Sequence, residues 1–107
     1  MEERIRDELK NLTEIILKTV PVEQIILFGS YANGMPHDSS DIDILVIIPD
    51  CAEIREIDAM RMIHKAIRDI KTMPVDIIVS KKETFDRRKR TPSIEREISE
   101  EGILLYG

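Results

Sequence analysis

The chain lacks the features that mark secreted and membrane-spanning proteins. Cys51 is its single cysteine, so no internal disulfide can form, and this suits a reducing cytosol. The longest uninterrupted apolar run, Ile44 to Ile48, is far shorter than the roughly 20 residues of a membrane-spanning helix. The N-terminal ten residues are too charged for a secretory signal peptide. We therefore expect a cytoplasmic protein that does not enter a membrane.

An excess of positive charge is also absent. The net charge is −5 at pH 7, which argues against stable nucleic-acid binding, because general nucleic-acid binders are normally basic. The strongest basic run is Arg87 to Arg90. The acidic residues after it favour a solvated helical face, and contact with a triphosphate, a partner or RNA is the alternative. With 107 residues, of which 42% are hydrophobic and 35% charged, residues 1–107 are expected to form one globular domain.

Hydrophobic periodicity predicts alternating helices and strands. Apolar residues spaced by three or four predict helices over residues 4–20, 53–71 and 83–90, and a last helix from Thr91-Pro92 to Gly102. Runs rich in β-branched residues predict strands over residues 22–28, 42–48 and 74–79, and residues 103–106 form a final edge strand or a docking tail. This order predicts an α/β or α+β fold, in which helices pack against a small mixed sheet.

Two aspartates at the start of the strand predicted over residues 42–48 point to metal binding. Asp41 and Asp43 are two residues apart, so on a strand their carboxylates project from one face, about 6–7 Å apart at their Cα atoms. Two carboxylates this close repel each other, and Mg²⁺ relieves the repulsion. Two such ions, about 3.5–4 Å apart, could share the carboxylates and clamp the attacking and leaving oxygens of a phosphoryl displacement.

A third aspartate interrupts the next strand. Asp76 lies within an otherwise apolar run, where an unpaired charge is costly. If the two strands are neighbours, Asp76 reaches the same metal cluster. It could then ligate one metal and accept the proton of an attacking hydroxyl.

Gly29 and Ser30 follow the strand predicted over residues 22–28 and provide the opposite polarity. Glycine lets a phosphate approach the backbone closely. Ser30 offers its N–H and its hydroxyl, particularly if a short helix begins there and points its N-terminus at the anion. The segment from Gly29 to Asp43 therefore predicts phosphate binding at one end and metal binding at the other.

This pattern resembles the DNA polymerase β-type nucleotidyltransferase superfamily. The resemblance consists of Gly29-Ser30, ten intervening residues, Asp41-x-Asp43, and Asp76 on a later strand. The short chain is similar to the minimal nucleotidyltransferase branch, the MntA-like antitoxin proteins, over nearly its whole length. The resemblance implies a small palm fold and a catalytic triad of Asp41, Asp43 and Asp76 that binds two magnesium ions together with ATP. It also implies that Gly29 and Ser30 hold phosphate.

The resemblance further implies an activity and a partner. The MntA-like members transfer AMP from ATP to a tyrosine of a HEPN ribonuclease toxin, which silences it. The short chain leaves no room for a second substrate-binding domain, which favours a protein acceptor. Two alternatives stay open: an antitoxin that neutralises its partner by binding alone, and a nucleotidyltransferase subunit that acts on a small molecule or RNA. Asn33 departs from the family pattern, because many relatives carry arginine there.

Other residues of chemical interest have simpler interpretations. His37 is expected to be a solvated loop histidine, with contact to substrate or metal as the alternative. Tyr31 packs at the loop or stacks on a base. His64 is structural or on the surface, and Cys51 is expected to be inert.

Overall fold

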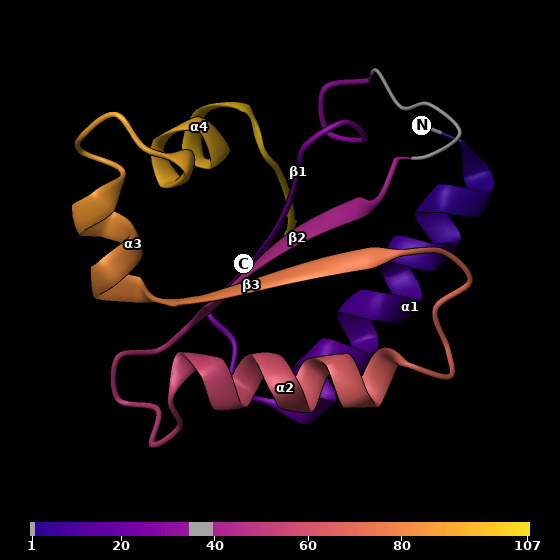
Figure 1. The fold of residues 1–107 in the computed structure, drawn as a ribbon, viewed down its shortest axis with the longest axis horizontal. Coiled ribbons are helices and arrows are strands. Elements are labelled where there is room, and N and C mark those ends of the chain that lie inside the picture. The colour runs from indigo at the N-terminus through magenta and orange to yellow at the C-terminus, as the bar shows by residue number, and fades with distance from the viewer. Residues whose placement is uncertain (1, 35–39) are drawn as a thin grey trace.

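A four-stranded mixed sheet with helices on both faces forms the fold of this computed structural model, which describes residues 2–34 and 40–107 (Figure 1). The elements in chain order are α1 (Glu3–Thr19), β1 (Gln24–Phe28), β2 (Ile42–Ile48), α2 (Glu56–Ile67), β3 (Val75–Lys81), α3 (Lys82–Arg88), α4 (Ile94–Glu101) and β4 (Ile103–Tyr106). The strand order is β3-β2-β1-β4; β2 and β3 are parallel, and the other neighbouring pairs are antiparallel. The predicted fold class is confirmed.

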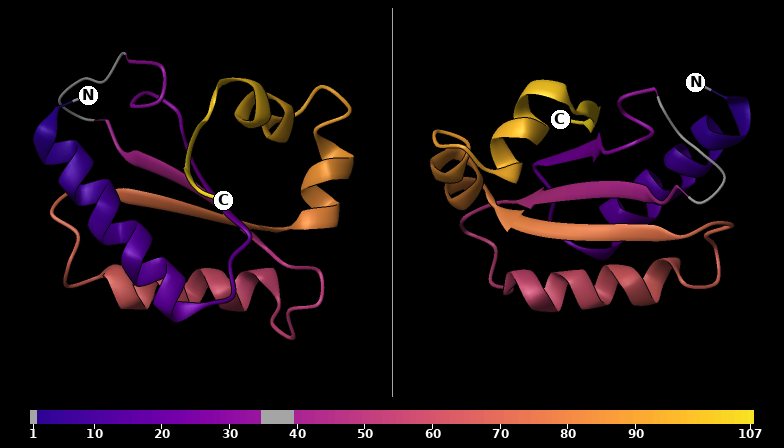
Figure 2. Two further views of the ribbon diagram at one scale, coloured as in Figure 1. Left: turned by 180° about the vertical axis from the view of Figure 1, so that it is seen from behind. Right: turned by 45° about the horizontal axis from the view of Figure 1, so that its top comes forward.

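The central strand β2 is buried on both faces, and the two faces have different partners. Ile42, Ile44, Val46 and Ile48 belong to the main core, together with the apolar sides of α1 and α2. The alternate residues Leu45 and Ile47 form a smaller cluster with residues of α3, α4 and β1. Figure 2 shows α1 and α2 on one side of the sheet and α3 and α4 on the other.

The helices α3 and α4 leave one end of their face of the sheet uncovered. Leu45 is 1% exposed and Ile47 0%, whereas Ile78 of the neighbouring strand is 38% exposed. Asp43, two residues before Leu45 on the same face, is half-buried. The described residues therefore leave this face of the sheet open at the end where β2 begins.

Two glutamates fix strand β3 at its ends. Glu8 of α1 is 6% exposed, and its Oε2 accepts hydrogen bonds from the Thr72 N–H at 2.7 Å and the Thr72 hydroxyl at 2.9 Å. At the other end of the strand, the N–H of Lys81 donates to Oε2 of Glu56 at 2.9 Å. Hydrogen bonds to charged groups contribute about 1.5–3 kcal/mol each. The alignment of β3 beside β2 thus depends on carboxylates distant in sequence.

Several predicted boundaries are wrong by a few residues. The second helix spans Glu56–Ile67 and not 53–71, and β1 begins at Gln24. The last helix starts at Ile94, and its N-cap is Ser93, whose hydroxyl accepts from the Arg96 N–H, so Pro92 lies outside the helix. Residues 103–106 pair with β1 as an edge strand. None of the described helices is long and apolar enough to cross a membrane.

Candidate active site

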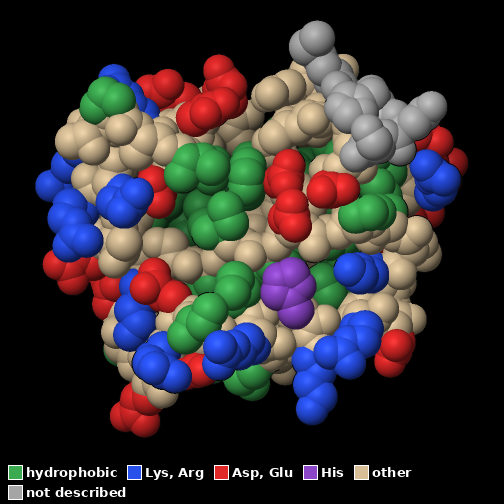
Figure 3. Space-filling model, viewed as in Figure 1, with side chains coloured by type: hydrophobic (Ala, Val, Ile, Leu, Met, Phe, Trp, Pro, Cys, Tyr) green, Lys and Arg blue, Asp and Glu red, His purple; other side chains and the backbone are tan. Residues whose placement is uncertain are grey.

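The sheet register brings the candidate aspartates together. Asp43 of β2 and Asp76 of β3 are direct partners in the parallel pair, and such neighbours lie about 4.8 Å apart with their side chains on the same face. Asp41 comes immediately before β2, which begins at Ile42. Strands β2 and β3 are therefore neighbours, as the grouping of the three aspartates requires. Figure 3 shows acidic side chains gathered on this face beside hydrophobic ones.

The electrostatics of Asp43 reflect this crowding. Burial raises the pKa of Asp43 above its ordinary value of 3.8, and the negative charges of Asp76 and Asp41 raise it further. Asp41 is half-buried and Asp76 is exposed. The carboxylates thus act on one another, and a cation among them would relieve the repulsion.

Gly29 lies directly against the Asp43 carboxylate. Its φ of +76° belongs to the left-handed region, which favours glycine. A Cβ at this position would collide with the Oδ2 atom of Asp43. The backbone of the turn can approach the carboxylate only because residue 29 has no side chain.

The turn after Gly29 folds back on the glycine carbonyl. The N–H groups of Ala32 and Asn33 both donate to the carbonyl oxygen of Gly29, at 3.1 and 3.0 Å. Residues 30–34 form a turn and not a helix, so Ser30 is not at the start of a helix. Any anion held here would be bound by the turn backbone and by Ser30, which is half-buried.

The donor set fits magnesium. Three oxygen-bearing carboxylates that repel one another suit a hard cation, and Mg²⁺ normally takes one or two carboxylates and fills its octahedron with waters and substrate phosphates. The described residues contain no group of three or more His, Cys, Asp or Glu side chains already placed to hold an ion. Asp41, Asp43 and Asp76 would supply only some of the ligands of such an ion.

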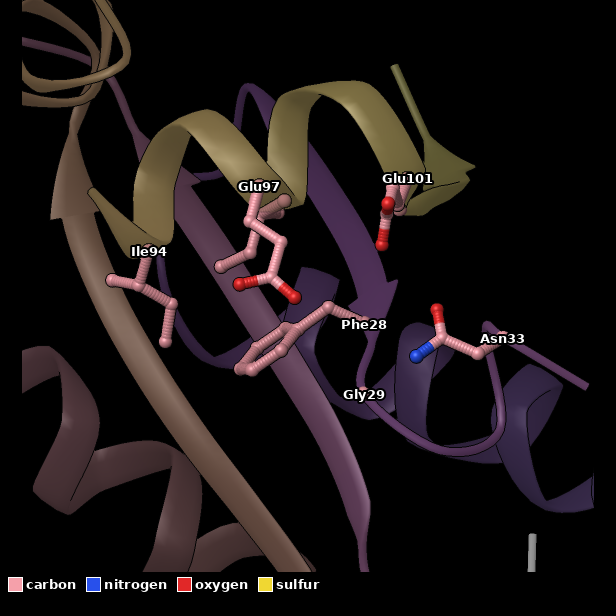
Figure 4. A pocket seen from close by; sticks show the side chains of 8 residues that line it. Phe28, Gly29, Asn33, Ile94, Glu97 and Glu101 are labelled. Carbon is pink, nitrogen blue, oxygen red and sulfur yellow. The ribbon is translucent and has the colours of Figure 1, made fainter. Parts of the chain in front are cut away.

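A small cavity beside the turn is a feature that sequence reasoning missed. It lies between α4 and the turn and has a volume of about 110 Å³. Its lining residues are Phe28, Gly29, Asn33, Ile94, Glu97, Ile98, Glu101 and Gly102. Figure 4 shows the Glu97 carboxylate above the Phe28 ring and the Glu101 carboxylate on the side of Asn33. Glu97 and Glu101 were not predicted as site residues, because they follow a basic run whose positive charge they could offset.

Other candidate residues lie apart from this group or outside the described residues. His37 is outside the described residues. Cys51 is an exposed free thiol. Within the basic run, Arg88 pairs with Glu95 at 3.0 Å and Lys89 pairs with Asp86 at 3.0 Å. These pairs balance part of the positive charge, although the Glu95 side chain is only 14% exposed.

The two remaining candidates have intermediate exposure. Tyr31 is partly buried and packs against the main core, which agrees with the packing interpretation of the two that the sequence left open. His64 is half-buried in α2.

Comparison with known proteins identifies the family. Residues 6–105 match the family model described as a nucleotidyltransferase domain. The chain is 36% identical over 87 residues to the candidate protein adenylyltransferase MJ0604 of Methanocaldococcus jannaschii, and the match covers 79% of each protein. The crystal structure of a candidate nucleotidyltransferase from Sulfolobus solfataricus is similar with a TM-score of 0.66 and 28% identity, over 94% of this chain and 78% of that one.

Two toxin–antitoxin structures have the same fold. A mutant of the MntA-HpeT pair gives a TM-score of 0.63 at 20% identity, over 92% of this chain and 72% of that one. A toxin–antitoxin structure with AMP-PNP gives 0.58 at 24% identity, over 92% of this chain and 73% of that one. These two similarities show the fold, whereas the family model spans nearly the whole chain. The chain belongs to the nucleotidyltransferase family and is a nucleotidyltransferase enzyme.

Proposed function

We propose that residues 1–107 form one minimal nucleotidyltransferase domain that moves AMP from ATP to a hydroxyl of a partner protein. The observation that carries this proposal is the register of β2 and β3, which pairs Asp43 with Asp76 beside Asp41. The close approach of Gly29 to Asp43 adds a phosphate-binding turn at the same place. Together these residues provide a binding place for the nucleotide and a carboxylate for the acceptor.

Each residue has a defined role in the proposed reaction. The acceptor hydroxyl oxygen forms a bond to the α-phosphorus, the bond from that phosphorus to the bridging oxygen breaks, and pyrophosphate leaves. Asp76 accepts the proton of the hydroxyl. Gly29 and Ser30 bind the phosphates that leave through the turn backbone and the Ser30 hydroxyl. Two Mg²⁺ ions, held by Asp41, Asp43 and Asp76, would supply charge stabilisation for the attacking and leaving oxygens.

Similar proteins support a protein acceptor and a toxin partner. The relative MJ0604 carries the name of a candidate protein adenylyltransferase. The MntA-HpeT structure is a toxin–antitoxin pair, and the structure with AMP-PNP pairs this fold with an ATP analogue. We therefore propose that the chain is an antitoxin and that the acceptor is a tyrosine of a HEPN-type ribonuclease toxin.

Calorimetric titration of ATP with and without Mg²⁺ tests the nucleotide site. We expect the parent chain to bind ATP only with Mg²⁺, and Asp43→Asn to lose this binding, because the carboxamide has the shape of the carboxylate without its charge. Asp50→Asn is a matched control, since Asp50 is an exposed aspartate just beyond the other end of β2. Equal Mg²⁺-dependent binding by the parent chain and Asp43→Asn would contradict the proposed site.

The acceptor is tested by mass spectrometry after incubation with ATP, Mg²⁺ and a candidate HEPN-type partner protein. An added AMP on a tyrosine of that protein, absent with Asp43→Asn, is the expected result. If the parent chain adds no AMP and yet suppresses the ribonuclease, it acts by binding alone.

A further inference from the structure

The cavity between α4 and the Gly29 turn lies next to Asp43, and of its lining residues only Gly29 has a role in the proposed reaction. Phe28, which forms one wall, is the direct strand partner of Asp43. The volume of about 110 Å³ is well below the roughly 300–1,000 Å³ of pockets that enclose a drug-sized ligand. The cavity is therefore suited to one ring system of a ligand whose remainder lies at the aspartates.

Charge decides which part of a nucleotide can enter. Glu97 and Glu101 stand on the α4 side of the cavity (Figure 4), and among the ion pairs of the described residues neither takes part. No lysine or arginine is among the lining residues. Two unpaired carboxylates repel a triphosphate, whereas a nucleobase is neutral. The base is the part of the nucleotide that this cavity accepts.

The lining residues match the surface of adenine. Phe28 and Ile94 provide apolar contact, and stacking of a base on an aromatic side chain contributes about 1–3 kcal/mol. The Glu97 carboxylate lies above the Phe28 ring and, when ionised, can only accept hydrogen bonds. Adenine presents an amino group that donates and ring nitrogens that accept. The carboxamide of Asn33, across the cavity from α4, can donate to a ring nitrogen.

The geometry points to this cavity as the nucleobase site, with the adenine ring against Phe28 and Ile94 and its amino group donating to Glu97. This assignment rests on the proposed function, because it takes the ligand to be a nucleoside triphosphate bound at the aspartates. Helix α4 then determines which base the enzyme accepts, while Asp41, Asp43 and Asp76 determine what is done with the phosphates.

Comparing ATP with inosine triphosphate (ITP) tests the assignment, because hypoxanthine carries a carbonyl oxygen in place of the amino group of adenine and an N–H in place of the acceptor nitrogen beside it. We expect the parent chain with Mg²⁺ to bind ATP about tenfold tighter than ITP, since a hydrogen bond to a charged group is replaced by repulsion between oxygens. In Glu97→Gln the side-chain amide can accept from the amino group of adenine or donate to the carbonyl oxygen of hypoxanthine. The ratio of the ATP affinity to the ITP affinity should therefore fall close to one.

Glu100→Gln is the matched control. It removes the same charge from the same helix, but Glu100 pairs with Arg96 on the exposed surface and does not line the cavity. It should keep the ATP to ITP ratio of the parent chain. Circular dichroism and melting temperatures establish that each variant is folded.

Two results would overturn the assignment and leave the proposed function intact: equal affinity of the parent chain for ATP and ITP, or an unchanged ratio in Glu97→Gln. A different result separates the two proposals. If the parent chain discriminates ATP from ITP through Glu97 but transfers no AMP to any protein acceptor, the nucleobase site is supported and the proposed AMP transfer is contradicted. If neither ATP nor ITP binds in the presence of Mg²⁺, both the nucleobase site and the proposed function are contradicted.

Discussion

At the scale of single residues, Gly29 and Asp43 constrain each other. Gly29 has a φ of +76°, and the space that a side chain would need is filled by the Asp43 carboxylate. The glycine is therefore required twice, once for its backbone conformation and once for the position of the carboxylate. The structure offers a way to separate these two effects.

Gly29→Ala should impair both stability and Mg-ATP binding. The substitution places an L-residue in the left-handed region, which costs about 1–2 kcal/mol, and it pushes the Asp43 carboxylate out of position. Gly34→Ala is the control, because Gly34 has a φ of +73° but no atom of the described residues outside its immediate neighbours lies within 4 Å of where its Cβ would be. Urea unfolding should show a similar loss of stability in both variants. Calorimetry should show a loss of ATP binding only in Gly29→Ala. Equal ATP binding in the two variants would refute the role given to this close approach.

Asp43→Asn should change how stability depends on pH. The pKa of Asp43 is raised in the folded chain above its ordinary value of 3.8. Its contribution to stability is therefore fully present below that value and is lost as the pH rises through the raised pKa. Without metal, the parent chain should lose stability over this range relative to Asp43→Asn. Melting temperatures from about pH 3 upward would check this, and parallel curves for the two proteins would contradict it.

At the scale of elements, β3 carries Asp76 and depends on carboxylates from two helices for its place. Glu8 of α1 binds Thr72 before the strand, and Glu56 of α2 binds the N–H of Lys81 at its end. These bonds join segments 64 and 25 residues apart in sequence. They hold one member of the site in register with the others.

Glu8→Ala should destabilise the chain by about 1–3 kcal/mol, because it removes the buried carboxylate that accepts from both the N–H and the hydroxyl of Thr72. The control is Glu14→Ala on the same helix, since Glu14 is exposed and the stability should change by less than about 0.5 kcal/mol. Chemical unfolding measures both. A Glu8→Ala variant as stable as Glu14→Ala would show that this hydrogen-bonded pair does not hold β3.

The sequence predicted the positions of helices and strands along the chain better than the way they pair and pack. Apolar spacing identified α1 and β2. The two-residue spacing predicted that Asp41 and Asp43 lie on one face of a strand, whereas β2 begins only after Asp41. The pairing of Asp43 with Asp76 could be stated only as a condition, because register depends on contacts such as those of Glu8, which no local pattern encodes. The position of α4 over the Gly29 turn was not predictable for the same reason. Pro92 was misplaced because Ser93 is the better N-cap.

At the scale of the whole molecule, binding of Mg-ATP should stabilise the fold. The aspartates and the turn come from β1, β2, β3 and the loop after β1, so a ligand that bridges them favours the folded chain over the unfolded one. At 100 times its dissociation constant, a ligand adds about 2.7 kcal/mol of stability. The melting temperature of the parent chain should therefore rise with Mg-ATP.

Two controls accompany this measurement. The melting temperature of the parent chain should rise little with ATP in a chelator, and that of Asp43→Asn should rise little with Mg-ATP. An equal rise in the variant would mean that the nucleotide binds elsewhere on the molecule.

The order of the strands has a consequence for the two substrates. The turn and the α4 cavity lie at β1, Asp41 and Asp43 lie at β2, and Asp76 lies on β3, beyond which the described chain adds no further strand. A nucleotide and an acceptor would therefore approach the aspartates from different sides, with neither in the path of the other. Under the proposed function neither has to arrive first, so we expect a random order of addition, in which a docked protein acceptor does not prevent ATP from entering.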